Sequence, residues 1–312
     1  MKQYLVLNLA YGYGSWGDEM ILDGVLTRLG RSNCTVYSWD PDETRAMHNV
    51  SAVGPNEPFQ PHDTLWIGGS GWGYGDHAPN LCREIKGALD HGKEVVIEAA
   101  GLRAHPHWRG MGKVLRRVDS MTVRDTFSQQ LARDEIGREC EIVPDPSLSM
   151  GIEDVLLEQG IWAGINVVND PIALGKVAPI CEILANSGYQ LLALPTIAHK
   201  RTARLNGHIA AQKLGKMVGA TVQDIKGPWY GGSLGPRQLA GLAQHCAIMV
   251  AMRKHGCWLA QRTQRRVLML DWFDDHGNDH RLGPLRELIP NSSYYDLHTE
   301  HDPQMAVKRF LQ

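Results

Sequence analysis

The 312-residue sequence lacks an excess of charge of either sign, because 32 basic residues stand against 34 acidic ones and the formal net charge is −2. A chain without such an excess has no global field that attracts nucleic acid or an anionic membrane. It also lacks any apolar run near the roughly 18 residues of a membrane-spanning helix. We therefore expect no nucleic-acid partner and no membrane span, and any anionic ligand must be bound by a local cluster of cations.

The sequence has few cysteines, and its six are scattered without any Cys-x-x-Cys spacing. We expect reduced thiols, as in a cytoplasmic protein. We also expect the N-terminal stretch to be a first strand and not a secretory signal, because its apolar part before the first glycines is short and no small-residue cleavage site follows. We expect no metal and no cofactor, and the sequence leaves the oligomeric state open.

The sequence does contain alternating strand and helix patterns, and 43% of its residues are hydrophobic, enough for sizeable cores. The pattern predicts a Rossmann-like domain in residues 1–150 and restarts in residues 161–312. The acidic, helix-like residues 151–160 form the candidate linker. We expect an α/β fold in which two Rossmann-like domains face a cleft. Whether a last helix near residues 303–311 packs back on the first domain is open.

Three cationic or titratable side chains follow directly on one apolar run. Residues 247–252 are typical of a strand buried on both faces of a parallel sheet, and Arg253, Lys254 and His255 come next. A helix is predicted only from residue 257, so alternation along an extended segment would point Lys254 away from its neighbours. In open α/β sheets, ligands bind at the carboxyl ends of the strands. This segment is therefore the candidate site for an anion.

A G-x-G-x-x-G pattern begins at Gly12, between a predicted strand and a predicted helix, with Asp40 placed as a ribose-binding acid. The pattern is typical of dinucleotide-binding proteins. However, Asp18 and Glu19 would occupy the helix N-terminus that should receive the pyrophosphate, and their charge repels it. A tight turn capped by Asp18 fits at least as well, so a dehydrogenase ranks last among the functions considered.

A second glycine-rich segment, residues 68–76, follows the strand predicted at residues 64–67. Its backbone can approach a ligand closely, and Trp72 and Tyr74 offer flat faces for a sugar or a base. The alternative is a loop that is only flexible. Trp229 and Tyr230 leave the same choice open between stacking on a sugar and packing.

Two segments contain histidines in patterns that match no metal motif. His105 and His107 lie beside a proline, and four aspartates and two histidines fall within residues 271–280. In either segment, a metal site would need further ligands from other parts of the chain. We interpret both as polar surface segments.

Several segments, taken in order, resemble the polysaccharide pyruvyl transferase family. The resemblance spans nearly the whole chain, and it implies a two-domain, glycosyltransferase-B-like fold, in agreement with the doubled pattern. The matching segments are Gly14-Ser15-Trp16-Gly17-Asp18-Glu19, Ile67-Gly68-Gly69-Ser70 with Asp76, Val123-Arg124-Asp125 with Ser128 and Leu131, Val143-Pro144-Asp145-Pro146, Gly164-Ile165-Asn166 and Met252-Arg253-Lys254-His255.

The resemblance implies transfer of the enolpyruvyl group of phosphoenolpyruvate to two hydroxyls of one sugar, giving a cyclic ketal and phosphate. On this basis His255 is expected to transfer the proton, while Arg253 and Arg124 bind the phosphate and carboxylate of the donor. The expected substrate-binding residues are Gly14, Asp18, Gly69, Ser70, Gly71, Trp72, Asp145 and Lys254.

Two segments depart from the family pattern. Residues 270–276 replace a tyrosine and a lysine that the family commonly has, and residues 195–201 are basic where acidic residues are usual. A divergent member with a different acceptor is one interpretation. The alternatives are a glycosyltransferase that uses a nucleotide-sugar, because the same fold supports either reaction, and a catalytically silent glycan-binding protein.

Overall fold

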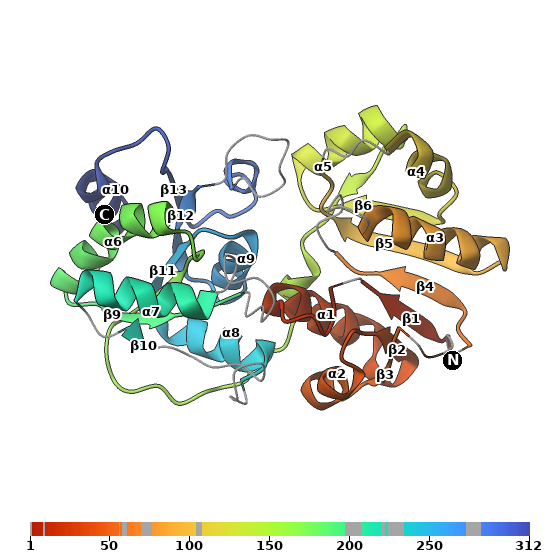
Figure 1. Cartoon of the computed structure of the whole chain (residues 1–312), viewed down its shortest axis with the longest axis horizontal. Coiled ribbons are helices and arrows are strands. Elements are labelled where there is room, and N and C mark those ends of the chain that lie inside the picture. The colour runs from red at the N-terminus through yellow and green to blue at the C-terminus, as the bar shows by residue number, and fades with distance from the viewer. Residues whose placement is uncertain are drawn as a thin grey trace. The chain divides into compact units, whose positions relative to one another are not determined.

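The chain divides into two compact units, which are coloured in chain order in Figure 1. The computed structural model describes residues 2–8, 10–55, 57, 61–69, 77–103, 108–196, 207–219, 222–223, 234–272 and 282–312. The first unit contains the chain up to Tyr13 and Asp18–Met150. The second contains Gly14–Gly17 and most of the chain after Met150.

The first unit is built on a seven-stranded sheet in the order β3-β2-β1-β4-β5-β6-β7, with every pairing parallel. Its strands are β1 (Tyr4–Leu7), β2 (Cys34–Tyr37), β3 (Ser51–Val53), β4 (Thr64–Ile67), β5 (Glu94–Ala100), β6 (Ser120–Val123) and β7 (Glu141–Ile142). Its helices are α1 (Trp16–Leu29), α2 (Pro41–His48), α3 (His77–Asp90), α4 (Trp108–Leu115) and α5 (Thr126–Leu131), with short turns η1 (Arg31–Asn33), η2 (Ala132–Ile136) and η3 (Pro146–Ser149).

Both faces of this sheet are covered, as parallel sheets require. Because side chains alternate along a strand, Leu5 and Leu7 join one apolar cluster while Val6 joins the other. Val6 packs in the cluster that includes Ile21 and Val25 of α1. The β1–α1 connection is thus fixed by core packing on both sides.

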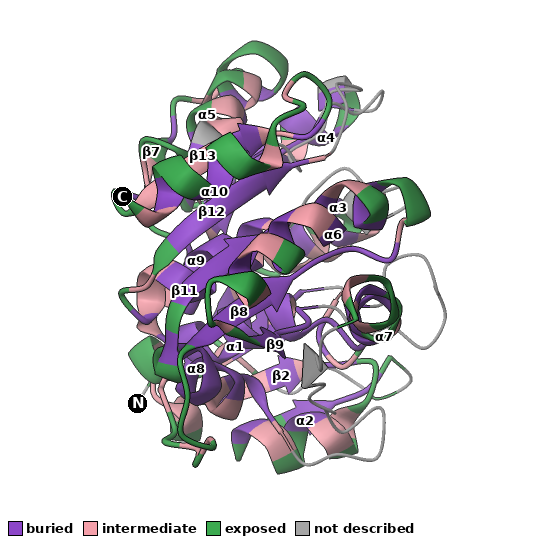
Figure 2. Ribbon diagram, turned by 90° about the vertical axis from the view of Figure 1, so that its left-hand side faces the viewer, coloured by how far each residue is buried: buried purple, intermediate pink, exposed green. Residues whose placement is uncertain are grey.

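The second unit is a six-stranded parallel sheet in the order β10-β9-β8-β11-β12-β13. Figure 2 shows its central strands as buried. The strands are β8 (Trp162–Asn166), β9 (Gln190–Ala193), β10 (Val222–Gln223), β11 (Cys246–Ala251), β12 (Arg266–Asp271) and β13 (Ser292–Asp296). The helices are α6 (Pro171–Asn186), α7 (Gly207–Val218), α8 (Pro236–His245), α9 (Lys254–Arg262) and α10 (Pro303–Leu311), with the turn η6 (Gly283–Leu285).

The final helix, α10, packs within the second unit, against α6 and β13. Its apolar face is carried by Val307 and Phe310, which belong to the buried core of that unit. Val307 and Phe310 thus anchor the last helix to the core of the second unit.

Residues 151–160 form no helix, so the helix-like interpretation of this segment is wrong. The backbone of Glu153 is instead bonded to α8, since its N–H donates to the carbonyl of Arg237 at 3.2 Å. Gly241 lets the segment lie against α8, because a Cβ there would collide with the carbonyl oxygen of Glu153. A tertiary contact outweighs the helical pattern of the sequence.

All six cysteines are buried and free, which confirms the expectation of thiols. Burial raises the pKa of the Cys34, Cys82, Cys181 and Cys246 thiols to about 12. Among the described residues, no helix is long and apolar enough to cross a membrane.

Candidate active site

The cations singled out from the sequence lie where β11 passes into α9. Arg253 is the N-cap of α9, and Lys254 and His255 form its first turn. The helix therefore begins at Lys254 rather than at residue 257, so the extended arrangement expected for this segment holds for Arg253 but is wrong for Lys254 and His255. The first backbone N–H groups of a helix have no intrahelical partner, so this turn concentrates donors as well as cationic side chains.

The three side chains differ in exposure. Lys254 is only 6% exposed, whereas Arg253 and His255 are half-buried. A half-buried histidine and arginine at a helix N-terminus can meet an anionic ligand and still be held by the surrounding protein. This arrangement suits anion binding combined with proton transfer.

Asn166 ties together the strand ends beneath this turn. Its side-chain N–H₂ donates to the carbonyl of Leu194 at 2.7 Å and to the hydroxyl of Thr196 at 3.1 Å, and its backbone carbonyl accepts from Met252 at 2.8 Å. Gly256 is required beside it, because a Cβ at this position would collide with the Asn166 side-chain oxygen. Asn166 is fully buried and holds β8, β9 and β11 in register, a role that sequence reasoning missed.

Gly17 packs directly against His255. A Cβ on Gly17 would collide with the imidazole ring, and the Gly17 N–H donates to the carbonyl of Thr196 at 3.0 Å. Gly17 and His255 both belong to the second unit. The third glycine of the G-x-G-x-x-G pattern is thus explained by the close approach of a histidine.

In the first unit, Arg124 and Asp145 form a buried ion pair. Their side chains are 3% and 0% exposed, and Arg124 Nη1 lies 3.2 Å from Asp145 Oδ2. Asp145 also accepts hydrogen bonds from the N–H and hydroxyl of Ser147, at 3.0 and 2.7 Å. Gly101 makes room for the guanidinium, which a Cβ there would strike. The structure brings these two predicted residues together as partners.

A second buried cluster surrounds His48 at the end of α2. Its Nε2 is 2.8 Å from Glu19, its Nδ1 is 3.7 Å from Asp23, and Glu19 also accepts the N–H of Gly12 at 2.7 Å. Burial alone would lower the pKa of His48, but the two carboxylates outweigh it and raise this pKa to about 9. Glu19 is thus held by protein groups inside the first unit.

The other predicted residues are placed as follows. Asp18 lies in the first turn of α1, which begins at Trp16, and the carbonyl of Gly69 accepts a hydrogen bond from Asn8 at 3.2 Å. Gly14 has φ 95, a conformation that favours glycine. Ser70, Gly71 and Trp72 lie outside the described residues, as do Tyr74, His105, His107, Trp229, Tyr230 and most of residues 271–280.

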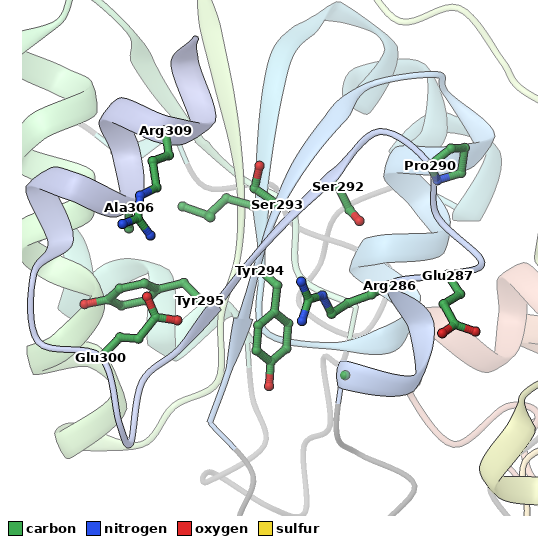
Figure 3. A pocket seen from close by; sticks show the side chains of 12 residues that line it. Arg286, Glu287, Pro290, Ser292, Ser293, Tyr294, Tyr295, Glu300, Ala306 and Arg309 are labelled. Atoms are coloured by element: carbon green, nitrogen blue, oxygen red, sulfur yellow. The ribbon is translucent and has the colours of Figure 1, made fainter.

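Within the part of the chain that the structure describes, no group of three His, Cys, Asp or Glu residues could hold a metal ion. A cavity of about 600 Å³ lies beside β13 in the second unit. Figure 3 shows Arg309 of α10 on one side of the strand and Arg286 and Glu287 on the other. None of the predicted site residues that the structure describes lines this cavity.

The sequence matches the model of one protein family, and the structure resembles several solved structures. The family model for polysaccharide pyruvyl transferase matches residues 17–275. No curated protein matches the sequence.

Among solved structures, a UDP-GlcNAc 2-epimerase from Neisseria meningitidis bound to UDP-GlcNAc has a TM-score of 0.61 at 10% identity, covering 100% of this chain and 91% of its own. A UDP-GlcNAc 2-epimerase from Methanocaldococcus jannaschii has a TM-score of 0.59 at 9% identity, with coverages of 100% and 92%. CalG4, the calicheamicin glycosyltransferase, has a TM-score of 0.51 at 11% identity, with coverages of 99% and 90%. At such identities the likeness shows the fold, which is glycosyltransferase-B-like with two Rossmann-like domains.

Proposed function

Because the chain belongs to the polysaccharide pyruvyl transferase family and is therefore a transferase, we propose that it moves the enolpyruvyl group of phosphoenolpyruvate onto a sugar of a polysaccharide or glycan precursor. The acceptor hydroxyls become the oxygens of a ketal, and phosphate leaves. The observation that carries the proposal is the first turn of α9, where Arg253 and His255 stand together, half-buried, after the carboxyl end of β11.

The reaction needs a site that supports each of its steps. The methylene carbon of the donor must take up a proton, which leaves a cationic carbon that one sugar hydroxyl attacks. The carbon–oxygen bond to phosphate then breaks, a second hydroxyl closes the ketal, and the two hydroxyl protons are released. We assign the proton transfer to His255, because an imidazole can both give and take a proton during catalysis.

The donor carries a phosphate and a carboxylate, and planar guanidinium groups bind both in a bidentate manner. Arg253 is proposed to bind one of these groups, supported by its position as the N-cap of α9. Lys254 is buried, so we propose that it attracts the anionic donor through its charge without contacting it directly. Arg124 remains the proposed second arginine, and its pair with Asp145 would fix its orientation.

Phosphate release from phosphoenolpyruvate in the presence of oligosaccharide acceptors tests the proposal. Arg253→Ala and His255→Ala are expected to abolish release while leaving the melting temperature within a few degrees of that of the wild type. Arg253→Lys keeps the charge but loses the planar fork, so it should restore little.

The matched control is His245→Ala, because His245 is an exposed histidine directly before β11, whereas His255 follows the same strand. Its activity should equal that of the wild type. Full activity in both Arg253→Ala and His255→Ala would refute the assignment. A melting temperature raised by UDP-GlcNAc but not by phosphoenolpyruvate would replace the proposal by a nucleotide-sugar glycosyltransferase.

A further inference from the structure

The first unit exposes a pair of aromatic rings. Tyr13 is 38% exposed and Trp39 is 47% exposed, and among the described residues no other aromatic side chain is as exposed as either. The two rings contact each other, with centroids 6.2 Å apart and planes at 56°. Single exposed apolar residues are ordinary, but a paired set of large aromatic faces indicates a binding surface.

Backbone hydrogen bonds and close packing fix the backbone beside both rings. The N–H of Trp39 donates to the carbonyl of Tyr11 at 3.0 Å, and the N–H of Gly12 donates to the buried carboxylate of Glu19 at 2.7 Å. Gly12 has φ 70, and a Cβ on it would collide with the hydroxyl of Ser38. The backbone that carries the pair is therefore set before any ligand arrives, and little backbone entropy is lost on binding.

The surroundings of the pair are acidic. Asp40 follows Trp39 directly and accepts the N–H of Glu43 at 3.0 Å as the N-cap of α2. Asp42 and Glu43 complete three carboxylates within four residues, of which Asp42 is paired with Arg45 at 2.6 Å. Such a surface repels phosphate groups and attracts hydroxyl donors.

We propose that Tyr13 and Trp39 bind an uncharged sugar ring of the acceptor glycan, an inference that rests on the proposed pyruvyl transfer. The C–H face of a sugar packs on the indole, and its hydroxyls donate to a carboxylate oxygen of Asp40. Both aromatic residues follow the carboxyl ends of strands, β1 and β2, where ligands bind in such sheets. The tilted rings leave no parallel slot for a nucleotide base, and the carboxylates disfavour its phosphates.

Binding of neutral oligosaccharides of galactose, glucose and mannose, followed by saturation-transfer NMR without phosphoenolpyruvate, tests the subsite separately from turnover. Trp39→Ala should weaken the binding of at least one of them about tenfold, and Trp39→Phe should restore most of it. Ile172→Ala, which trims a side chain 66% exposed in the second unit, should change nothing. Both replaced side chains are exposed, so the fold should be retained.

In the phosphate-release assay, the same Trp39→Ala variant should raise the KM for the acceptor and leave the KM for phosphoenolpyruvate within about twofold. The subsite is refuted if no oligosaccharide binds the wild type, or if Trp39→Ala and Tyr13→Ala both bind as tightly as the wild type. Loss of UDP-GlcNAc binding in Trp39→Ala, with oligosaccharide binding unchanged, refutes it as well. If sugars bind as predicted but phosphoenolpyruvate is never consumed, the subsite stands and the pyruvyl transfer fails.

Discussion

Between pH 6.5 and 9 the free energy of unfolding should fall by about 3 kcal/mol through His48 alone. Burial opposes the charge on this group, but the carboxylates of Asp23 and Glu19 outweigh burial and raise its pKa in the folded protein to about 9. In the unfolded chain the pKa of histidine is about 6.5, and each unit of difference corresponds to about 1.4 kcal/mol. Because the folded pKa is the higher one, this stabilisation is complete below pH 6.5 and is lost as pH rises through 9.

The assay is urea denaturation at a series of pH values for the wild type and for His48→Gln. Gln keeps an N–H donor near Glu19 but carries no charge, so the variant should be less stable at pH 6 and should lack this part of the pH slope. His245→Gln, which replaces an exposed histidine, serves as the matched control and should retain the wild-type slope. A wild-type and a His48→Gln curve that run parallel across this range would show that His48 is not held as a cation between two carboxylates.

Three further changes have definite expected outcomes. Gly17→Ala should lower kcat at least tenfold by displacing the His255 ring, with little change in melting temperature, whereas Gly87→Ala, which meets open space, should leave kcat unchanged. Arg124→Ala should cost about 3 to 5 kcal/mol in urea denaturation, because it leaves the carboxylate of Asp145 buried without its cation, and a smaller loss would mean that water reaches the pair. Because all six cysteines are buried, a thiol reagent such as Ellman's reagent should modify none of them in the native protein and all of them in urea. Rapid labelling of the native protein would contradict this packing.

The sequence predicts strands best where a short apolar run stands between polar residues. The apolar runs at residues 64–67 and 120–123 predict two strands, and β4 (Thr64–Ile67) and β6 (Ser120–Val123) begin and end at these residues. The pair Asp170-Pro171 likewise predicts a helix start, and α6 begins there, with Asp170 capping it through hydrogen bonds to two N–H groups. These features depend on neighbours in the chain, which the sequence displays.

Other elements depend on contacts that the sequence does not display. The pattern does not predict α2 and β3, because Pro41–His48 is largely polar and its core contribution comes from a charged histidine paired with α1. The first turn of α9 has no apolar periodicity, so the pattern places the start of this helix too late in the chain. The pattern does place Arg253 and His255 at a strand end, but the contact of Gly17 with the imidazole joins segments far apart in sequence and leaves no local signal.

Asn166 stiffens the strand ends that carry the first turn of α9 in the second unit. A buried amide that bonds to Leu194 and Thr196 and adjoins Gly256 makes the carboxyl ends of β8, β9 and the start of α9 a single stiff block. A force applied to Arg253 or His255 is then shared by the ends of β8 and β9 and the start of α9 rather than absorbed by a bending loop. If His255 transfers a proton as proposed, Asn166 keeps the base of its turn in place during that step.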